Sequence, residues 1–154
     1  QHVLQLHTKG VYPIAPDGVP AKEVDANRGF VKGLQTGLAL KEIFADQDEQ
    51  IQIVSGLDHP FALDKEQEEA GYLYDPASGR YLTFRTDAPC VVTYSANFVD
   101  ESVIINGRPM IQHNGLALEA QALPDAIHSD LKDQVILKAG HIFTSTTVYF
   151  AVVK

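Results

Sequence analysis

Residues 72–84 read Tyr72-Leu73-Tyr74-Asp75-Pro76-Ala77-Ser78-Gly79-Arg80-Tyr81-Leu82-Thr83-Phe84. Both ends of this stretch are rich in aromatic and aliphatic residues, which are common in β-strands. Between them, Asp75-Pro76 favours the start of a turn, and Gly79 can adopt the positive φ angle that ends one. The stretch therefore predicts a β-hairpin, and it indicates a fold built mainly from antiparallel strands.

Further strands are predicted on both sides of this hairpin. They cover residues 3–6, 50–54, 90–99, 103–105, 116–123, 134–137 and 143–153. Asn106-Gly107 is a strong tight-turn signal after one of them. The predicted strand over residues 143–153 is apolar on both faces, which is typical of a strand buried on both sides. We therefore expect a mainly β protein, with the architecture of an antiparallel β-sandwich.

Few residues are expected outside strands and turns. Residues 38–44 form the only helix candidate, and a helix of about two turns needs packing to persist. Residues 11–20 contain three prolines, which disfavour both a helix interior and a central strand, so we expect an ordered loop. Residues 24–37 contain three glycines and mixed charges, and they are also expected to form a loop.

The composition narrows the class of function. The chain has 154 residues, which suits one domain or one piece of a larger domain. Its net charge is −8, so neither nucleic acid nor an anionic membrane surface is an expected partner. The single cysteine, Cys90, excludes an intramolecular disulfide. A free thiol is compatible with a reducing compartment, and we expect a cytoplasmic location.

Glu119 is the most informative acidic residue. It lies in the middle of Leu116-Ala117-Leu118-Glu119-Ala120-Gln121-Ala122-Leu123, an otherwise nearly apolar predicted strand. A carboxylate there is paired, faces solvent or faces a polar cavity, because an unpaired buried charge is costly. In a cavity its pKa can rise, and the group can then accept or donate a proton. The pattern alone leaves both a chemical and a structural role open.

Asp58 and Tyr94 are candidate binding residues. Asp58 follows a predicted strand within Ser55-Gly56-Leu57-Asp58-His59-Pro60-Phe61, where its two oxygens could accept hydrogen bonds from neighbouring sugar hydroxyls. Capping of a turn is the structural alternative. Tyr94 and Phe98 lie on one face of the strand predicted over residues 90–99, and such rings either stack on a sugar or pack in a core.

Other chemical motifs are missing from the sequence. The six histidines have no metal-ligand spacing, and there is no nucleophile elbow or phosphate-binding loop. We therefore expect no metal and no cofactor. Cys90 lies in an apolar strand, where we expect a buried filler and not a nucleophile.

Five segments, in order, resemble motifs of the aldose 1-epimerase family, the family of galactose mutarotases. They are Ser55–Phe61 for a Gly-x-Asp-His motif, Tyr74–Arg80 for a hairpin, Val92–Phe98 for a Tyr-and-Asn-Phe strand, Leu118–Ala126 for a Glu-x-Gln and Pro-Asp-Ala motif, and Leu137–Gly140 before the closing strand. The resemblance extends along nearly the whole chain. It implies a part of the large β-sandwich of that family.

The resemblance also implies an isomerase that interconverts the α and β anomers of hexoses such as galactose and glucose. In this family a glutamate removes the proton from the C1 hydroxyl, and by resemblance that base is Glu119. A histidine protonates the ring oxygen, so that the ring opens and recloses on the other face. Asp58 would hold sugar hydroxyls, and Tyr94 would lie beside the sugar. Proton transfers alone complete the reaction, so no cofactor is implied.

One part of the family pattern is missing. The histidine acid, a second histidine and a substrate arginine lie in the half of the family's domain that precedes this segment, and the Asn-His motif of the acid is not found here. The chain begins at Gln1 instead of methionine. We therefore expect residues 1–154 to be the C-terminal portion of the domain. The N-terminal half is its expected partner, and we expect self-association when that half is absent.

Three alternatives remain open from the sequence. A non-catalytic carbohydrate-binding β-sandwich would need Asp58 and Tyr94 but not Glu119. A hexose-6-phosphate 1-epimerase would need clustered basic residues, whereas the arginines here are scattered along the chain. A purely structural β-domain would bind no hexose at all.

Overall fold

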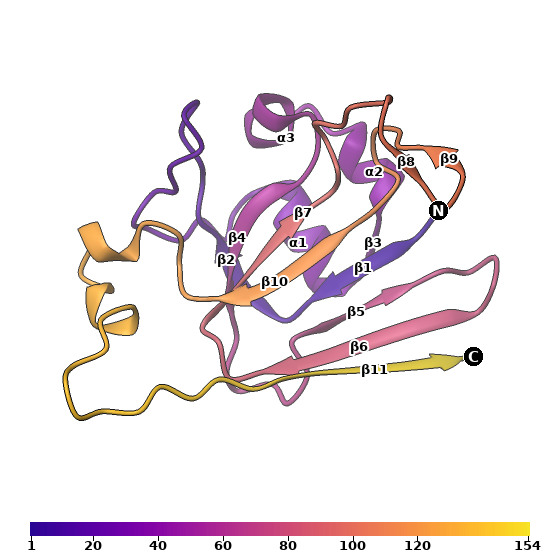
Figure 1. Ribbon diagram of the computed structural model, residues 1–154. Helices are drawn as coiled ribbons and strands as arrows, with labels where there is room; N and C mark the ends of the chain where they lie inside the picture. The colour runs from indigo at the N-terminus through magenta and orange to yellow at the C-terminus, as the bar shows by residue number, and fades with distance from the viewer.

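Two antiparallel sheets form the body of the protein in the computed structural model, which describes residues 1–154 (Figure 1). The larger sheet has the strand order β11-β6-β5-β1-β3, and the smaller has the order β10-β7-β4-β2. Leu4 and Phe84 of the larger sheet share one buried cluster with Phe61 and Val91 of the smaller. The predicted antiparallel two-sheet architecture is therefore confirmed.

The larger sheet is built around the predicted hairpin. Its strands are β1 (Val3–Leu6), β3 (Leu38–Ala39), β5 (Gly71–Tyr74), β6 (Arg80–Thr86) and β11 (Thr147–Val153). In the turn between β5 and β6, the Asp75 carboxylate accepts hydrogen bonds from the Ala77 backbone N–H and the Ser78 hydroxyl. Gly79 has φ 73°, and a Cβ atom there would lie 2.5 Å from the Lys154 carbonyl oxygen. Glycine is thus needed both for the turn and for the close approach of the C-terminus.

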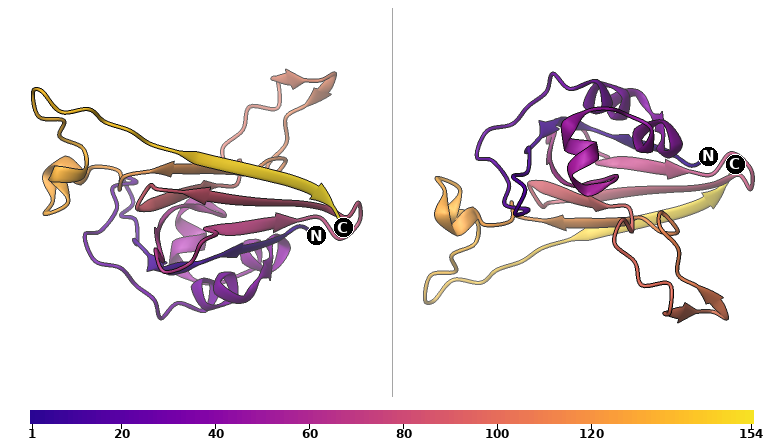
Figure 2. Two further views of the ribbon diagram at one scale, coloured as in Figure 1. Left: turned by 90° about the horizontal axis from the view of Figure 1, so that it is seen from below. Right: turned by 90° about the horizontal axis from the view of Figure 1, so that it is seen from above.

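The smaller sheet carries the predicted site residues. Its strands are β2 (Thr8–Val11), β4 (Asp58–Leu63), β7 (Cys90–Tyr94) and β10 (Ala117–Gln121). A separate hairpin, β8 (Ile104–Ile105) and β9 (Arg108–Pro109), turns at Asn106-Gly107, as predicted. Figure 2 shows that this hairpin and the segment between β10 and β11 project away from the body of the molecule.

Three short helices complete the core. They are α1 (Gly29–Thr36), α2 (Leu40–Phe44) and α3 (Glu49–Val54). They gather on the side of the sheets opposite the β8–β9 hairpin (Figure 2). Phe30 of α1 meets the ring of Phe61 of β4 edge-on, with the ring centroids 6.5 Å apart. The helices therefore pack directly against the strands that position the site.

Two of the helices correct predictions from the sequence. The expected loop over residues 24–37 contains α1, whose Phe30, Val31 and Leu34 are fully buried, so burial outweighs the low helix propensity of its glycines. The expected strand over residues 50–54 is the helix α3. The carboxylate of Asp48 caps α3 by accepting a hydrogen bond from the Gln50 backbone N–H at 2.9 Å. The predicted helix over residues 38–44 is confirmed only in part, because Leu38 and Ala39 pair with β1.

Three further predictions, all for residues after position 89, are corrected. Residues 134–137 form no strand; two short 3₁₀ helices, η1 (Ala126–His128) and η2 (Lys132–Gln134), lie before them, and the second includes Gln134. The strand predicted over residues 90–99 ends at Tyr94, since Ala96 adopts φ 51°. The strand expected to be buried on both faces is β11, most of which is exposed. It lies at the edge of the larger sheet and pairs only with β6, so its other edge has no neighbouring strand.

Candidate active site

Strand register brings the three predicted site residues together on the smaller sheet. Asp58 of β4 lies opposite Tyr94 of β7, and Tyr94 lies opposite Ala117 of β10. Glu119 lies opposite Val92, two residues from Tyr94 on the same strand. Since side chains alternate along a strand, Asp58, Tyr94 and Glu119 all point to one face. The buried cluster that includes Phe61 and Val91 occupies the other face.

Two carboxyl groups, those of Asp58 and Glu119, lie on this face. Asp58 is half-buried, whereas Glu119 is exposed. Burial raises the pKa of Asp58 above its ordinary value, and the negative charge of Glu119 raises it further. A pair of carboxylates of this kind can accept hydrogen bonds from several hydroxyls and can also accept a proton. Of the three environments considered for Glu119, the solvent-facing one describes this chain.

The floor between the two carboxyl groups is apolar. Val92 lies between Glu119 on β10 and Pro60 on β4 in the register, and both Val92 and Pro60 are buried. Polar oxygens therefore flank a small apolar surface. A pyranose ring presents the same combination, with C–H groups on its faces and hydroxyls at its rim.

Tyr94 is fixed by its own hydroxyl. The hydroxyl accepts a hydrogen bond from the Phe98 backbone N–H at 3.1 Å and lies 3.3 Å from the Phe98 carbonyl oxygen, to which it donates. It is therefore committed to the loop after β7, and the ring is the part of Tyr94 that can contact a ligand. Phe98, predicted to share the strand face of Tyr94, lies beyond the end of the strand with 66% of its surface exposed.

Two residues that the sequence analysis did not single out support this face. Ser95 and Asn97 follow Tyr94, are buried, and make hydrogen bonds to the backbone of Leu57, the residue before Asp58. The only sequence signal for such a role is that these two polar residues follow the largely apolar strand β7. Their partner could not be found from sequence, because it depends on the register between β4 and β7.

His59 is separate from the candidate site although it follows Asp58 in sequence. Its side chain is fully buried on the core face, 6.1 Å from the ring of Phe30. Burial lowers the pKa of His59 to about 4, so the imidazole is neutral near pH 7. Its Nδ1 atom accepts a hydrogen bond from the Asp58 backbone N–H at 3.1 Å. These features describe a structural histidine and not an acid directed at a ligand.

No histidine occupies the site face of the three strands. The residues that alternate onto it are Asp58, Pro60, Ala62, Cys90, Val92, Tyr94, Ala117, Glu119 and Gln121. Burial raises the pKa of Cys90 to about 12, which leaves a protonated and unreactive thiol. The site face of these three strands thus carries two carboxyl groups, those of Asp58 and Glu119, and no histidine.

Other chemistries have little support in the structure. No group of three or more His, Cys, Asp or Glu residues is arranged to hold a metal ion. Arg28 is ion-paired with Asp25, Asp48 and Glu49, and Arg85 with Glu68 and Glu69, so these two arginines do not form a phosphate cluster. None of the helices has the length and apolar character needed to cross a membrane.

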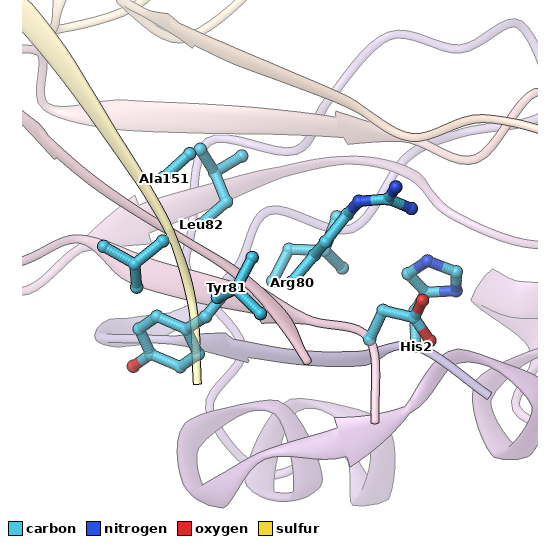
Figure 3. A pocket seen from close by; sticks show the side chains of 9 residues that line it. His2, Arg80, Tyr81, Leu82 and Ala151 are labelled. Carbon is cyan, nitrogen blue, oxygen red and sulfur yellow. The ribbon is translucent and has the colours of Figure 1, made fainter. Parts of the chain in front are cut away.

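Two hollows of the surface lie away from the three predicted residues. One, of about 650 Å³, is lined by His2 and by residues of β5, β6 and β11 (Figure 3). Another, of about 950 Å³, lies between the start of β7, the end of β10 and the segment before β11. Neither includes Asp58, Tyr94 or Glu119 in its lining. The candidate site is therefore separate from these two hollows.

Comparison with known proteins gives a single family. A family profile described as aldose 1-epimerase matches residues 1–150. Galactose mutarotase of Homo sapiens is 29% identical over 149 residues, which cover 95% of this chain and 42% of the human protein. The chain therefore spans less than half the length of the curated relatives it matches.

Solved structures share the fold. A GalM/aldose epimerase homologue from C. elegans superimposes with a TM-score of 0.81 at 20% identity, covering 99% of this chain and 46% of that one. A galactose 1-epimerase from Lactobacillus acidophilus NCFM gives a TM-score of 0.72 at 22% identity, covering 97% and 42%. Together with the profile match over nearly the whole chain, these similarities place the protein in the aldose 1-epimerase family.

Proposed function

We propose that this chain supplies the general base and part of the sugar site of an aldose 1-epimerase, a mutarotase that interconverts the anomers of hexoses such as galactose and glucose. The observation that carries the proposal is the register of β4, β7 and β10, which gathers Asp58, Tyr94 and Glu119 on one face. Asp58 holds sugar hydroxyls, the Tyr94 ring lies against the sugar, and Glu119 transfers the proton.

The proposed reaction consists of proton transfers and one bond rotation. Glu119 takes the proton of the C1 hydroxyl while an acid protonates the ring oxygen, and the bond from C1 to the ring oxygen breaks. The carbonyl end of the open sugar rotates. The ring oxygen then attacks the other face of the carbonyl, returns its proton to the acid, and the new C1 oxygen takes the proton from Glu119. Atoms and charges balance without a cofactor.

The acid that protonates the ring oxygen is not one of the three candidate site residues. Because the site face of the smaller sheet carries no histidine, we assign the acid to an N-terminal half of the same domain. The exposed apolar side chains of β11 are the surface such a half would cover. Self-association of the chain alone is part of the same proposal. So is a cytoplasmic location, which rests on the single free thiol of Cys90.

A non-catalytic carbohydrate-binding role is the second candidate. It is favoured by the exposure of Glu119, since a base in open solvent gains little from its surroundings. In that role Asp58 and Tyr94 would bind the sugar, and Glu119 would be dispensable.

Polarimetry of freshly dissolved α-galactose tests the proposal. The chain, its Glu119→Gln variant and the control Glu23→Gln, an exposed glutamate in a loop, are compared with the spontaneous rate. We expect the chain alone to remain near the spontaneous rate. Together with an N-terminal half it should accelerate mutarotation, and Glu119→Gln should lower that rate at least about 100-fold while Glu23→Gln leaves it unchanged.

Two results would contradict parts of the proposal. Mutarotation by the chain alone that disappears in Glu119→Gln would mean that the acid lies within residues 1–154. Galactose binding that is equal in Glu119→Gln and the unaltered chain, without catalysis by the complete domain, would favour the carbohydrate-binding role.

A further inference from the structure

A closed set of hydrogen bonds holds the turn that leads into Asp58. Ser95 is 1% exposed and Asn97 is 6% exposed. The Leu57 N–H donates to Ser95 Oγ at 2.9 Å, and Asn97 Nδ2 donates to the Leu57 carbonyl at 2.8 Å. The Ser95 hydroxyl in turn lies 2.6 Å from Asn97 Oδ1. Both polar backbone groups of Leu57 are thereby bonded to the segment that follows β7.

Gly56 makes room for this arrangement. It adopts φ 148°, and a Cβ atom there would lie 2.4 Å from Asn97 Oδ1 and 2.7 Å from Ser95 Oγ. A side chain at this position would displace both polar groups. The turn before Asp58 and the loop after Tyr94 therefore fit each other only with glycine at residue 56.

The loop after β7 is also closed on its own side. Ala96, between Ser95 and Asn97, has φ 51° and turns the chain back. The Tyr94 hydroxyl bonds to both backbone polar groups of Phe98. Residues 94–98 are thus held by hydrogen bonds of their own, and the Ser95 N–H, the Ser95 hydroxyl and the Asn97 amide bond this loop to Leu57.

We propose that Ser95 and Asn97 are positioning residues of the sugar site, which lock Leu57 to the end of β7 and so fix Asp58 relative to Tyr94. This inference rests on the proposed function, because it assigns these two residues a role in the same site. A buried polar network whose members are all bonded is rigid, and a binding carboxylate needs that rigidity. Neither Ser95 nor Asn97 touches the sugar in this arrangement.

The carboxyl titration of Asp58 tests the inference independently of any sugar. It is followed by carbon NMR of the labelled side chain, in solutions dilute enough to keep the chain monomeric, for Ser95→Ala and Asn97→Ala. Thr8→Val is the matched control, because the Thr8 hydroxyl is also buried in the smaller sheet, where it donates to the Ala62 carbonyl at 2.6 Å. Galactose binding is measured on the same samples.

We expect both site variants to move the pKa of Asp58 down toward its ordinary value of about 3.9, because the released turn gives the carboxyl more contact with water. Galactose affinity should fall about tenfold in both. Thr8→Val should leave the titration and the affinity unchanged, although it also removes buried hydrogen bonds, because the Thr8 hydroxyl donates to the Ala62 carbonyl and accepts from the Gly10 N–H.

An Asp58 titration that is the same in Ser95→Ala, Asn97→Ala and the unaltered chain would overturn the inference. If Asn97→Ala fails to fold, Ser95→Ala decides, since it removes a single oxygen atom. If the unaltered chain binds no galactose, the binding part of the proposed function fails for this chain, whereas the titration still decides whether Ser95 and Asn97 position Asp58.

Discussion

Asp58 and His59 are neighbours in the chain with opposite surroundings. Asp58 points to the open face of the smaller sheet, and His59 points into the core. Burial favours the uncharged form of both side chains. It therefore raises the pKa of Asp58 and lowers the pKa of His59. One dipeptide therefore combines a half-buried acid on the candidate site face with a buried, neutral histidine on the core face.

His59 makes the stability of the fold depend on pH. Its folded-state pKa is about 4, below the value of about 6.5 expected in the unfolded chain, so the unfolded state binds the proton more readily. The stabilisation is present above about pH 6.5 and is lost as the pH falls toward 4. We expect the free energy of unfolding to decrease by on the order of 3 kcal/mol over this range because of His59.

Urea unfolding followed by circular dichroism at several pH values measures this effect. The His59→Gln variant should lose most of the pH dependence between pH 6.5 and 4. The exposed histidine variant His141→Gln should keep it. Equal slopes in His59→Gln and the unaltered chain would show that His59 does not carry the dependence.

At the scale of elements, the helix α3 is joined to the proline-rich loop by the buried side chain of Gln50, which bonds to the backbone of Ile14. Gln50 is 4% exposed. Its Oε1 atom accepts a hydrogen bond from the Ile14 N–H at 2.6 Å, and its Nε2 atom donates to the Ile14 carbonyl at 3.1 Å. The proline-rich loop is thus bonded to the helix as it would be to a neighbouring strand.

Replacement of Gln50 by leucine should destabilise the protein. The change keeps a similar volume but leaves both backbone groups of Ile14 without partners, at a cost of about 1–3 kcal/mol for each buried group. Gln52→Leu is the control on the same helix, because Gln52 is exposed and makes one hydrogen bond, to the Asp46 carbonyl. Thermal unfolding should show a clearly lower midpoint for Gln50→Leu only, and similar midpoints would contradict this account of α3.

The elements that could be predicted are those whose cause is local. Asp75, Ser78 and Gly79 form their turn within five residues, and Asn106-Gly107 does so within two, so the sequence predicts the first hairpin and the tight turn of the second. The helix α1 depends on burial of Phe30 against distant strands, and no local signal outweighs its glycines. The exposure of β11 likewise depends on which strands lie beside it.

The candidate site could likewise be predicted from the sequence only in part. Asp58, Tyr94 and Glu119 were predicted from residue type and family resemblance, and the register of three strands places them on one face. The contribution of Ser95 and Asn97 could not be predicted, because their partner, Leu57, lies 38 and 40 residues away in the chain.

At the scale of the whole molecule, the two sheets have neighbouring free edges. The Tyr149 hydroxyl of β11 donates to the Leu118 carbonyl of β10 at 2.9 Å, and each of these strands is the last of its sheet. A sandwich with two open edges exposes backbone groups and apolar side chains together. Glu119 lies on β10, one of these two edge strands. A partner that covered the two edges would therefore also change the surroundings of the proposed base.

The exposed strand β11 should make the chain associate with itself when it is alone. Val148 is 52% exposed and Phe150 is 62% exposed, and both point to the same side of an edge strand that is paired with β6 alone. We expect sedimentation velocity to show species larger than 16.9 kDa that increase with concentration.

Lysine at both positions, 148 and 150, should shift the chain toward the monomer, because charges on an edge strand oppose pairing. Val19→Lys, at an exposed valine in a loop, should have no such effect. A chain that sediments as a monomer at all concentrations would mean that the open edge is protected without a partner.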